Sequence, residues 1–191
     1  MADIKGVHGY INREKKKRGL KAGLFFGIIA LIIIFGYIMT GTKLNWFTLI
    51  AVVLCLPGSK MLVQLITLMP YNSVAGGRAD EVAGSGHALT LVYETVITST
   101  EKIMPLEMTA VYDNTVCGYT GYDKVNTADA GKYLKTMLTQ NRLADVTVKI
   151  FNNYDNFLGR VREMNDLAEM NHKDSKEKEE HIRQVLLNLS L

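Results

Sequence analysis

Two uncharged apolar runs follow one another near the start of the chain. The first, Ala22 to Thr42, contains 21 residues, and the second, Leu44 to Ser59, contains 16. A helix rises 1.5 Å per residue, so the first run is long enough to cross the roughly 30 Å hydrocarbon core of a bilayer. The second run, at roughly 24 Å, is slightly short of that thickness. The pattern predicts two transmembrane helices that form a helical hairpin.

A cleaved signal peptide is the competing interpretation of the first run, because a basic stretch precedes it. The run is too long for a typical signal-peptide core, and no cleavage site of small residues appears before the second run begins. We therefore expect both segments to remain in the mature chain.

The end of the second run leaves three alternatives open. Pro57 removes a backbone donor and Gly58 loosens the turn, so the span can kink or stop at residues 57–58. The apolar stretch from Met61 to Met69 then either continues the span past the kink, lies at the membrane interface, or packs on the soluble domain as its first helix. We favour a single kinked element that extends to residue 69.

Lysine and arginine residues predict the orientation. The tail of residues 1–21 is rich in cations, whereas the loop 41–43 holds one. The positive-inside bias places the N-terminus and everything after the second span in the cytoplasm. Trp46 fits an outer interface anchor, and Lys60 can extend its ammonium group to the inner headgroups. The cations that we expect at the inner membrane interface are Lys15, Lys16, Lys17, Arg18 and Lys21, within the cytosolic tail.

Residues 70–86 read as a flexible linker, because glycine and alanine dominate them. Past the linker the periodicity becomes that of a sheet. Two alternating runs and a third short one form a three-strand meander, with an Asp113-Asn114 turn before the third strand. Leu89, Leu91, Tyr93, Thr95 and Ile97 are expected on one face of the first strand. Met104, Leu106, Met108, Ala110 and Tyr112 are expected on one face of the second.

Helical spacing takes over after the third strand. Apolar residues from Ala130 to Leu138 predict a crossover helix, and Val146 to Phe151 predict a fourth strand parallel to a neighbour. Two more amphipathic helices follow, at residues 157–168 and 175–191. Residues 87–191 are therefore expected to form a small cytosolic α/β (α+β) domain, large enough for a modest core.

Metal, disulfide and nucleic-acid sites find no support in the composition. Two cysteines are neither a disulfide framework nor a zinc site, and the four histidines show no ligand spacing. From Ala22 onward the chain has 15 Lys and Arg against 17 Asp and Glu, so the domain lacks the basic surface of a nucleic-acid-binding protein. We expect no cofactor, no metal and no nucleic-acid partner.

The order of helix, three-strand meander, crossover helix, fourth strand and flanking helix is similar to the core of the restriction-endonuclease-like nucleases. That resemblance implies a carboxylate on the second strand and a carboxylate-x-lysine on the third, which hold a divalent metal. The second strand offers Glu107 and, at its end, Asp113. The third, Thr115 to Thr120, has no such pair, and Asp123-Lys124 lies just beyond it with a different spacing.

Two functions remain open. The leading one is a binding or regulatory module at the membrane, with lipids as partners and a protein partner or self-association through the transmembrane helices or the C-terminal helix. The alternative is a membrane-tethered, metal-dependent hydrolase with a restriction-endonuclease-like α/β core, either active or catalytically degenerate. Its candidate catalytic residues are Glu94, Glu107, Asp113 and Asp123. The hydrolase predicts that at least three of these carboxylates converge in one cleft.

Overall fold

The chain divides into two compact units in a computed structural model that describes all residues except 1–4, 43–44, 100–101, 172–174 and 191. One unit, the hairpin unit, consists of residues 11–72. The other, the α/β unit, combines residues 1–10 with residues 73–191. The hairpin unit is therefore inserted into the α/β unit near its N-terminus.

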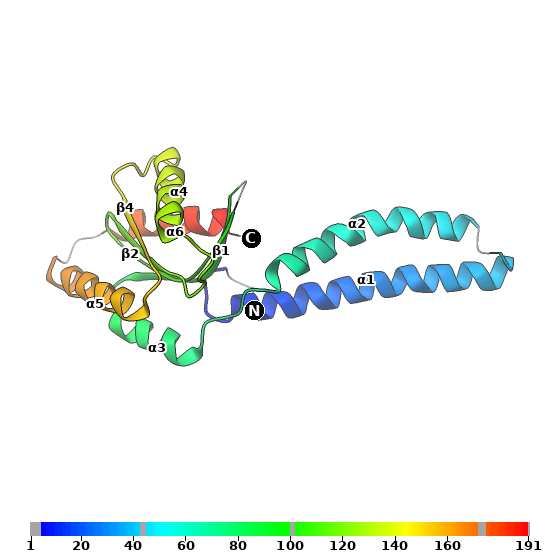
Figure 1. Ribbon diagram of the computed structural model, residues 1–191, viewed down its shortest axis with the longest axis horizontal. Helices are drawn as coiled ribbons and strands as arrows, with labels where there is room; N and C mark the ends of the chain where they lie inside the picture. Colours follow the sequence, from blue (N-terminus) through cyan, green and yellow to red (C-terminus); the bar gives the residue numbers. More distant parts are fainter. Residues whose placement is uncertain (1–4, 43–44, 100–101, 172–174, 191) are drawn as a thin grey trace. The chain divides into compact units, whose positions relative to one another are not determined.

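The hairpin unit consists of two helices, α1 (Tyr10–Thr40) and α2 (Trp46–Leu68), coloured blue to cyan in Figure 1. Asn45 closes the connection between them. Its side-chain oxygen caps α2 by accepting from the Thr48 backbone N–H at 2.8 Å, and its amide donates to the Thr40 hydroxyl at 2.9 Å. The helices approach closely at Gly36, where a Cβ atom would lie 2.5 Å from Phe47. Both helices are long and apolar enough to cross a membrane, as the sequence predicts.

Helix α2 is one uninterrupted element from Trp46 to Leu68, with Pro57 inside it. The second run of the sequence therefore continues as helix past residues 57–58, to Leu68. Met61 to Leu68 belong to the same helix, and residues up to 72 group with the hairpin unit and not with the α/β unit. A separate interfacial helix or a first helix of the soluble domain is not what the structure shows for this stretch.

The predicted cytosolic tail of residues 1–21 is divided between the two units. Its second half is helical, because α1 begins at Tyr10 and runs through the basic stretch into the apolar one. Lysine, arginine and glutamate are good helix formers, and Arg18 pairs with Glu14 one turn away at 2.8 Å. Lys15 donates to the Met69 carbonyl at 2.9 Å, which satisfies a terminal acceptor of α2 and complements its dipole.

The α/β unit has a four-stranded mixed sheet between two pairs of helices (Figure 1). The strands β1 (Thr90–Thr98), β2 (Ile103–Tyr112), β3 (Thr115–Tyr119) and β4 (Thr147–Phe151) lie in the order β1-β2-β3-β4. The first two pairings are antiparallel and the third is parallel, which confirms the meander and the crossover. The helices of this unit are α3 (Gly76–Ser85), α4 (Thr127–Gln140), α5 (Tyr154–Asn171) and α6 (Lys176–Leu189).

Each face of the sheet has its own hydrophobic core. The first core packs α4 and α6 on one face, with Leu134 and Ile182 almost fully buried. The second core packs α3 and α5 on the other, with Val82 and Phe157 at 0% exposure. The apolar stripe of α6 is thus buried within its own domain, since Ile182, Val185 and Leu186 belong to the first core.

A helix replaces part of the predicted linker. Within residues 70–86, Gly76 to Ser85 form α3, where the glycine and alanine content predicted a flexible loop. Two of its side chains, Ala79 and Val82, are buried against the sheet and α5. Tertiary packing of these two residues outweighs the poor helix propensity of the glycines.

The faces of β1 and β2 differ from the predicted alternation. Met104, Leu106, Met108 and Ala110 are alternate residues of β2 and were expected on one face. Met104 and Leu106 lie in the first core, but Met108 and Ala110 lie in the second. The offset coincides with Glu94, whose φ of 56° is in the left-handed region. The side chains of both strands switch faces at this point, and the register between the strands is unchanged. Tyr93 pairs with Met108 on one side of it, and Thr95 pairs with Leu106 on the other. The prediction of one continuous face in each strand was wrong for this reason.

Both ends of the described chain cover the free edge of β1. The Tyr93 backbone N–H donates to the Gly6 carbonyl at 2.9 Å, and the Val96 N–H donates to the Ser190 hydroxyl at 3.1 Å. Lys5 also donates to the Ser190 carbonyl at 3.1 Å. An edge strand protected in this way is less available for pairing with another chain.

Candidate functional site

The chain leaves the α/β unit after Tyr10 and returns to it at Ser73. We call these two points the chain crossings. Glu94, in the middle of β1, forms hydrogen bonds to the chain at both of them. Its Oε1 accepts from the Gly9 N–H at 2.7 Å and from the Val74 N–H at 3.3 Å, and its Oε2 accepts from the Ser73 hydroxyl at 2.8 Å. The side chain is buried, with 2% of the residue exposed. A buried carboxylate with three donors is a strong, charge-assisted link between two segments far apart in sequence.

The left-handed conformation of Glu94 follows from this role. A non-glycine residue in this region costs about 1–2 kcal/mol, and such strain persists only where surrounding contacts compensate for it. The three hydrogen bonds provide that compensation. His8 adds a further link between the crossings, because its Nε2 lies 2.7 Å from the Val74 carbonyl oxygen.

A cavity of about 320 Å³ lies among the same segments. The N-terminal segment before α1, the helix α3 that follows the hairpin unit, the strand β1 and the helix α6 all line it. The lining residues are Gly6, Val7, His8, Ala79, Asp80, Ala83, Leu91, Tyr93 and Arg183. Its volume is at the lower end of those found for small-molecule sites. Residues 6–8, which precede the first crossing, and residues 79–83, in the helix after the second, therefore contribute parts of the cavity wall.

The cavity is apolar on one part of its wall and charged on another. Burial, together with the nearby negative charge of Asp80, raises the pKa of Tyr93 above its ordinary value. The Tyr93 hydroxyl thus stays protonated at neutral pH, and it donates to the Ala79 carbonyl at 3.4 Å. Arg183 is largely covered, with 24% of its side chain exposed, and its Nη1 donates to Glu180 at 2.7 Å. A few polar groups that converge on an apolar cavity are typical of a ligand-binding site.

A second polar cluster joins α3 to α5. The Tyr154 hydroxyl donates to Glu81 Oε2 at 2.7 Å, and the Arg78 guanidinium lies 5.0 Å from the centre of the Tyr154 ring. The Tyr154 ring also meets Tyr119 edge to face, with ring centres 5.6 Å apart. Burial and the Glu81 carboxylate raise the pKa of Tyr154. These contacts fix the position of α3 above the sheet.

Glu107, on β2, is half-buried at the edge of this second cluster. Burial raises the pKa of Glu107, and the opposing effects of Arg78 and of the Gly121 backbone N–H are smaller. Burial and the charge of Glu107 in turn raise the pKa of Tyr119. A carboxyl group with a raised pKa beside a phenol is a feature of many functional sites, although structural clusters also produce it.

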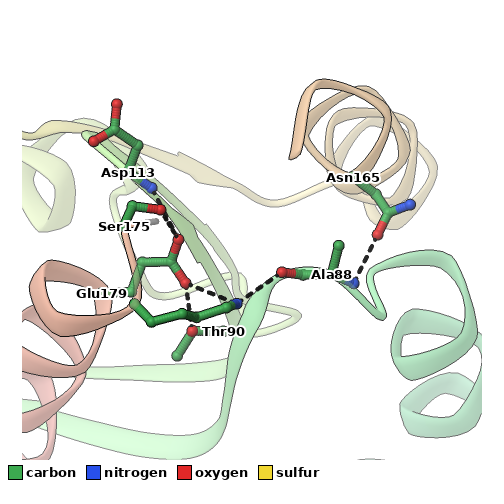
Figure 2. Close-up of polar contacts among 7 residues, drawn as sticks. Ala88, Thr90, Asp113, Asn165, Ser175 and Glu179 are labelled. Carbon is green, nitrogen blue, oxygen red and sulfur yellow. Dashed lines mark hydrogen bonds and ion pairs between the residues drawn. The ribbon is translucent and has the colours of Figure 1, made fainter. Parts of the chain in front are cut away.

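A second buried carboxylate, Glu179 of α6, is at 0% exposure. Figure 2 shows three of its partners: the Thr90 and Ser175 hydroxyls donate to it at 2.6 Å each, and the Asp113 backbone N–H donates at 3.3 Å. Lys176 pairs with it at 3.3 Å. This network ties α6 to the start of β1 and to the turn between β2 and β3, and so has a structural role.

A further link in the same view holds α5. The Asn165 side-chain oxygen accepts from the Ala88 N–H at 3.0 Å (Figure 2). Its amide donates to Glu169 at 2.6 Å. Asn165 is 5% exposed. Because Ala88 immediately precedes β1, this bond fixes α5 to the segment that enters the sheet.

The four carboxylates predicted as catalytic residues have four different surroundings. Glu94 binds the chain crossings, and Glu107 borders the cluster of α3 and α5. Asp113 occupies the turn between β2 and β3, where its φ is 45° and its backbone N–H donates to Glu179. Asp123 is exposed in the loop after β3. In the part of the chain that the structure describes, no three histidine, cysteine, aspartate or glutamate residues gather as a possible metal site.

Sequence reasoning did not find the cavity. Its charged groups, Asp80 and Arg183, are separated by about a hundred residues, and neither lies in a recognisable motif. Residues 6–8 were assigned to a tail and residues 79–83 to a linker, so the pattern gave no signal that they share a wall. Comparison of the chain with protein-family models, with curated proteins and with solved structures gave no match.

Proposed function

We propose that the protein is a two-pass membrane protein whose cytoplasmic α/β unit binds a small ligand and couples its presence to the membrane hairpin. The observation that carries this proposal is the cavity whose wall includes residues 6–8, shortly before the first crossing, and residues 79–83, in the helix that follows the second. A ligand there contacts the segment that leads into α1 and the helix that follows α2. Binding energy that differs between two arrangements of these segments shifts the balance between them.

The exposed apolar surface of the hairpin unit supports the membrane assignment. Of the most apolar 18-residue windows, only 17% of that in α1 and 11% of that in α2 is buried. A core helix of a soluble protein is mostly covered, and soluble proteins rarely expose apolar patches of this extent. A bilayer would cover these side chains. The basic residues before Ala22 support a cytoplasmic N-terminus, and an even number of spans then returns the α/β unit to the same side.

Cysteine labelling tests the membrane topology. In a Cys55→Ser background we would place single cysteines at Thr42, between the helices, and at Asn152, exposed in the α/β unit. We expect a membrane-impermeant maleimide to label Thr42→Cys on intact cells and Asn152→Cys only after lysis. The Cys55→Ser protein is the control, because its remaining Cys117 is fully buried. Labelling of Asn152→Cys on intact cells would contradict the proposed orientation.

Filling the cavity tests the coupling without knowledge of the ligand. Ala83→Phe adds a ring to the cavity wall and imitates occupancy. Spin labels at Lys16, in α1, and Glu163, on the exposed side of α5, report the distance between the two units in the full chain. We expect the mean distance to change by more than about 2 Å, the scale that separates domain rearrangement from side-chain adjustment.

The matched control for this measurement is Ala144→Phe, which adds the same ring at an exposed alanine outside the cavity. It should leave the distance distribution unchanged. Identical distributions for Ala83→Phe and the unmodified protein would contradict the coupling.

A further inference from the structure

We infer that the ligand of this cavity is a small zwitterion, of the kind represented by an aliphatic α-amino acid, with its carboxylate on Arg183 and its ammonium group on Asp80. This inference rests on the proposed function, because it names the ligand class of the same cavity.

The first argument is the guanidinium of Arg183. A guanidinium carries five N–H donors. Among the residues that the structure describes, the Arg183 side chain makes one hydrogen bond, from Nη1 to Glu180. The side chain is three-quarters covered, so its remaining donors have limited access to bulk water. Donors of this kind favour a planar oxyanion that accepts two parallel bonds, as a carboxylate does.

The second argument is the carboxylate of Asp80. It lines the same cavity from α3, and no hydrogen bond or ion pair of its side chain occurs within the described ranges. Asp80 and Arg183 thus bring opposite charges to one cavity without pairing with each other. Asp80 is exposed and Arg183 also pairs with Glu180. A ligand with both charges can contact both residues, whereas a ligand with one charge makes one of these two ionic contacts.

The third argument is the remainder of the wall. Val7, Ala79, Ala83 and Leu91 are aliphatic and line the cavity with the two charged residues. An aliphatic side chain on the ligand would gain the transfer free energy of the methylene groups that it buries. The volume of 320 Å³ equals that of about ten water molecules in the liquid. The cavity therefore suits a ligand of amino-acid size.

Calorimetry on the full-length protein in detergent micelles at pH 7 tests the inference with three probes. L-Leucine carries both charges, 4-methylpentanoate lacks the ammonium group, and 3-methylbutylamine lacks the carboxylate. We expect leucine to bind at least about tenfold more tightly than either analogue, since one charged hydrogen bond contributes at least that factor. Equal affinity of leucine and 4-methylpentanoate would overturn the zwitterion in favour of a simple carboxylate, and no binding of leucine would overturn the inference altogether.

Two variants assign the charges to their residues. Asp80→Asn should reduce the leucine affinity to that of 4-methylpentanoate and leave 4-methylpentanoate binding unchanged. Arg183→Gln should remove binding of both. Asp166→Asn, at an exposed aspartate of α5 outside the cavity, is the matched control and should bind leucine normally. Thermal melting of each variant separates loss of the site from loss of the fold, and leucine affinity unchanged in a folded Asp80→Asn protein would overturn the assignment.

The result is independent of the coupling test. If leucine does not bind but Ala83→Phe still shifts the distance between the units, the ligand class is wrong and the proposed function stands. If leucine binds but Ala83→Phe has no effect, the cavity is a binding site without the proposed coupling.

Discussion

Replacement of Glu94 by alanine should destabilise the α/β unit by about 3 kcal/mol. The substitution removes the acceptor of the partly buried Gly9 N–H and Ser73 hydroxyl and of the buried Val74 N–H. Loss of a charge-assisted hydrogen bond or of the partner of a buried group costs about 1–3 kcal/mol. At 2–4 °C per kcal/mol for a protein of this size, we expect the melting temperature of the full chain to fall by about 10 °C. Hydrogen exchange should quicken most at the Gly9 and Val74 amides.

Glu94→Gln is the matched control for this prediction. Glutamine keeps the shape of the side chain and one carbonyl oxygen, so it preserves part of the network and loses the charge-assisted strength of the bonds. We expect it to be destabilised by about half as much as the alanine variant. Unchanged exchange at both crossings in Glu94→Ala would show that other contacts hold these segments and that Glu94 does not.

The role of Glu94 also illustrates where the sequence stops predicting the structure. Local periodicity predicted the apolar helices, the meander, the crossover helix and the parallel fourth strand, since each depends on residues close in the chain. The partners of Glu94 lie 85 and 20 residues away, at Gly9 and Val74. No pattern in the strand Leu89 to Thr98 distinguishes a carboxylate that points to solvent from one that binds two distant backbone amides.

The same limit explains the error in the strand faces. A period of two assumes extended backbone throughout, and a single residue with φ of 56° is enough to reverse the alternation. Glutamate is not a residue type that favours the left-handed region, so composition gave no warning at position 94. The helix α3 was missed for a related reason, because its stability comes from the burial of Ala79 and Val82 and not from its propensity.

Removal of the second buried carboxylate should have an effect of similar size. Glu179→Ala leaves the Thr90 and Ser175 hydroxyls and the Asp113 N–H without their acceptor. We expect a loss of about 3 kcal/mol in the free energy of unfolding, roughly 1 kcal/mol for each of the three hydrogen bonds to the carboxylate. Denaturant unfolding of the full chain in micelles measures it. Glu180→Ala, at the neighbouring position on the exposed side of α6, should change the stability by less than about 1 kcal/mol.

The contribution of Glu179 to the free energy of unfolding should also depend on pH. The direction of its pKa shift determines whether that contribution grows or shrinks on acidification. Burial alone would raise the pKa of Glu179, but the hydrogen bonds from Ser175, Thr90 and the Asp113 N–H, with the charge of Lys176, hold it below its ordinary value of 4.5. A carboxyl group whose pKa is lower in the folded state binds fewer protons there than in the unfolded state. Its stabilisation is therefore fully present above about pH 4.5 and is lost as the pH falls through the folded-state pKa.

The stability difference between the native protein and Glu179→Gln, whose side chain does not titrate, should consequently be constant near neutral pH and shrink below about pH 4.5. A difference that grows on acidification would mean that the Ser175, Thr90 and Asp113 donors do not outweigh burial at this position.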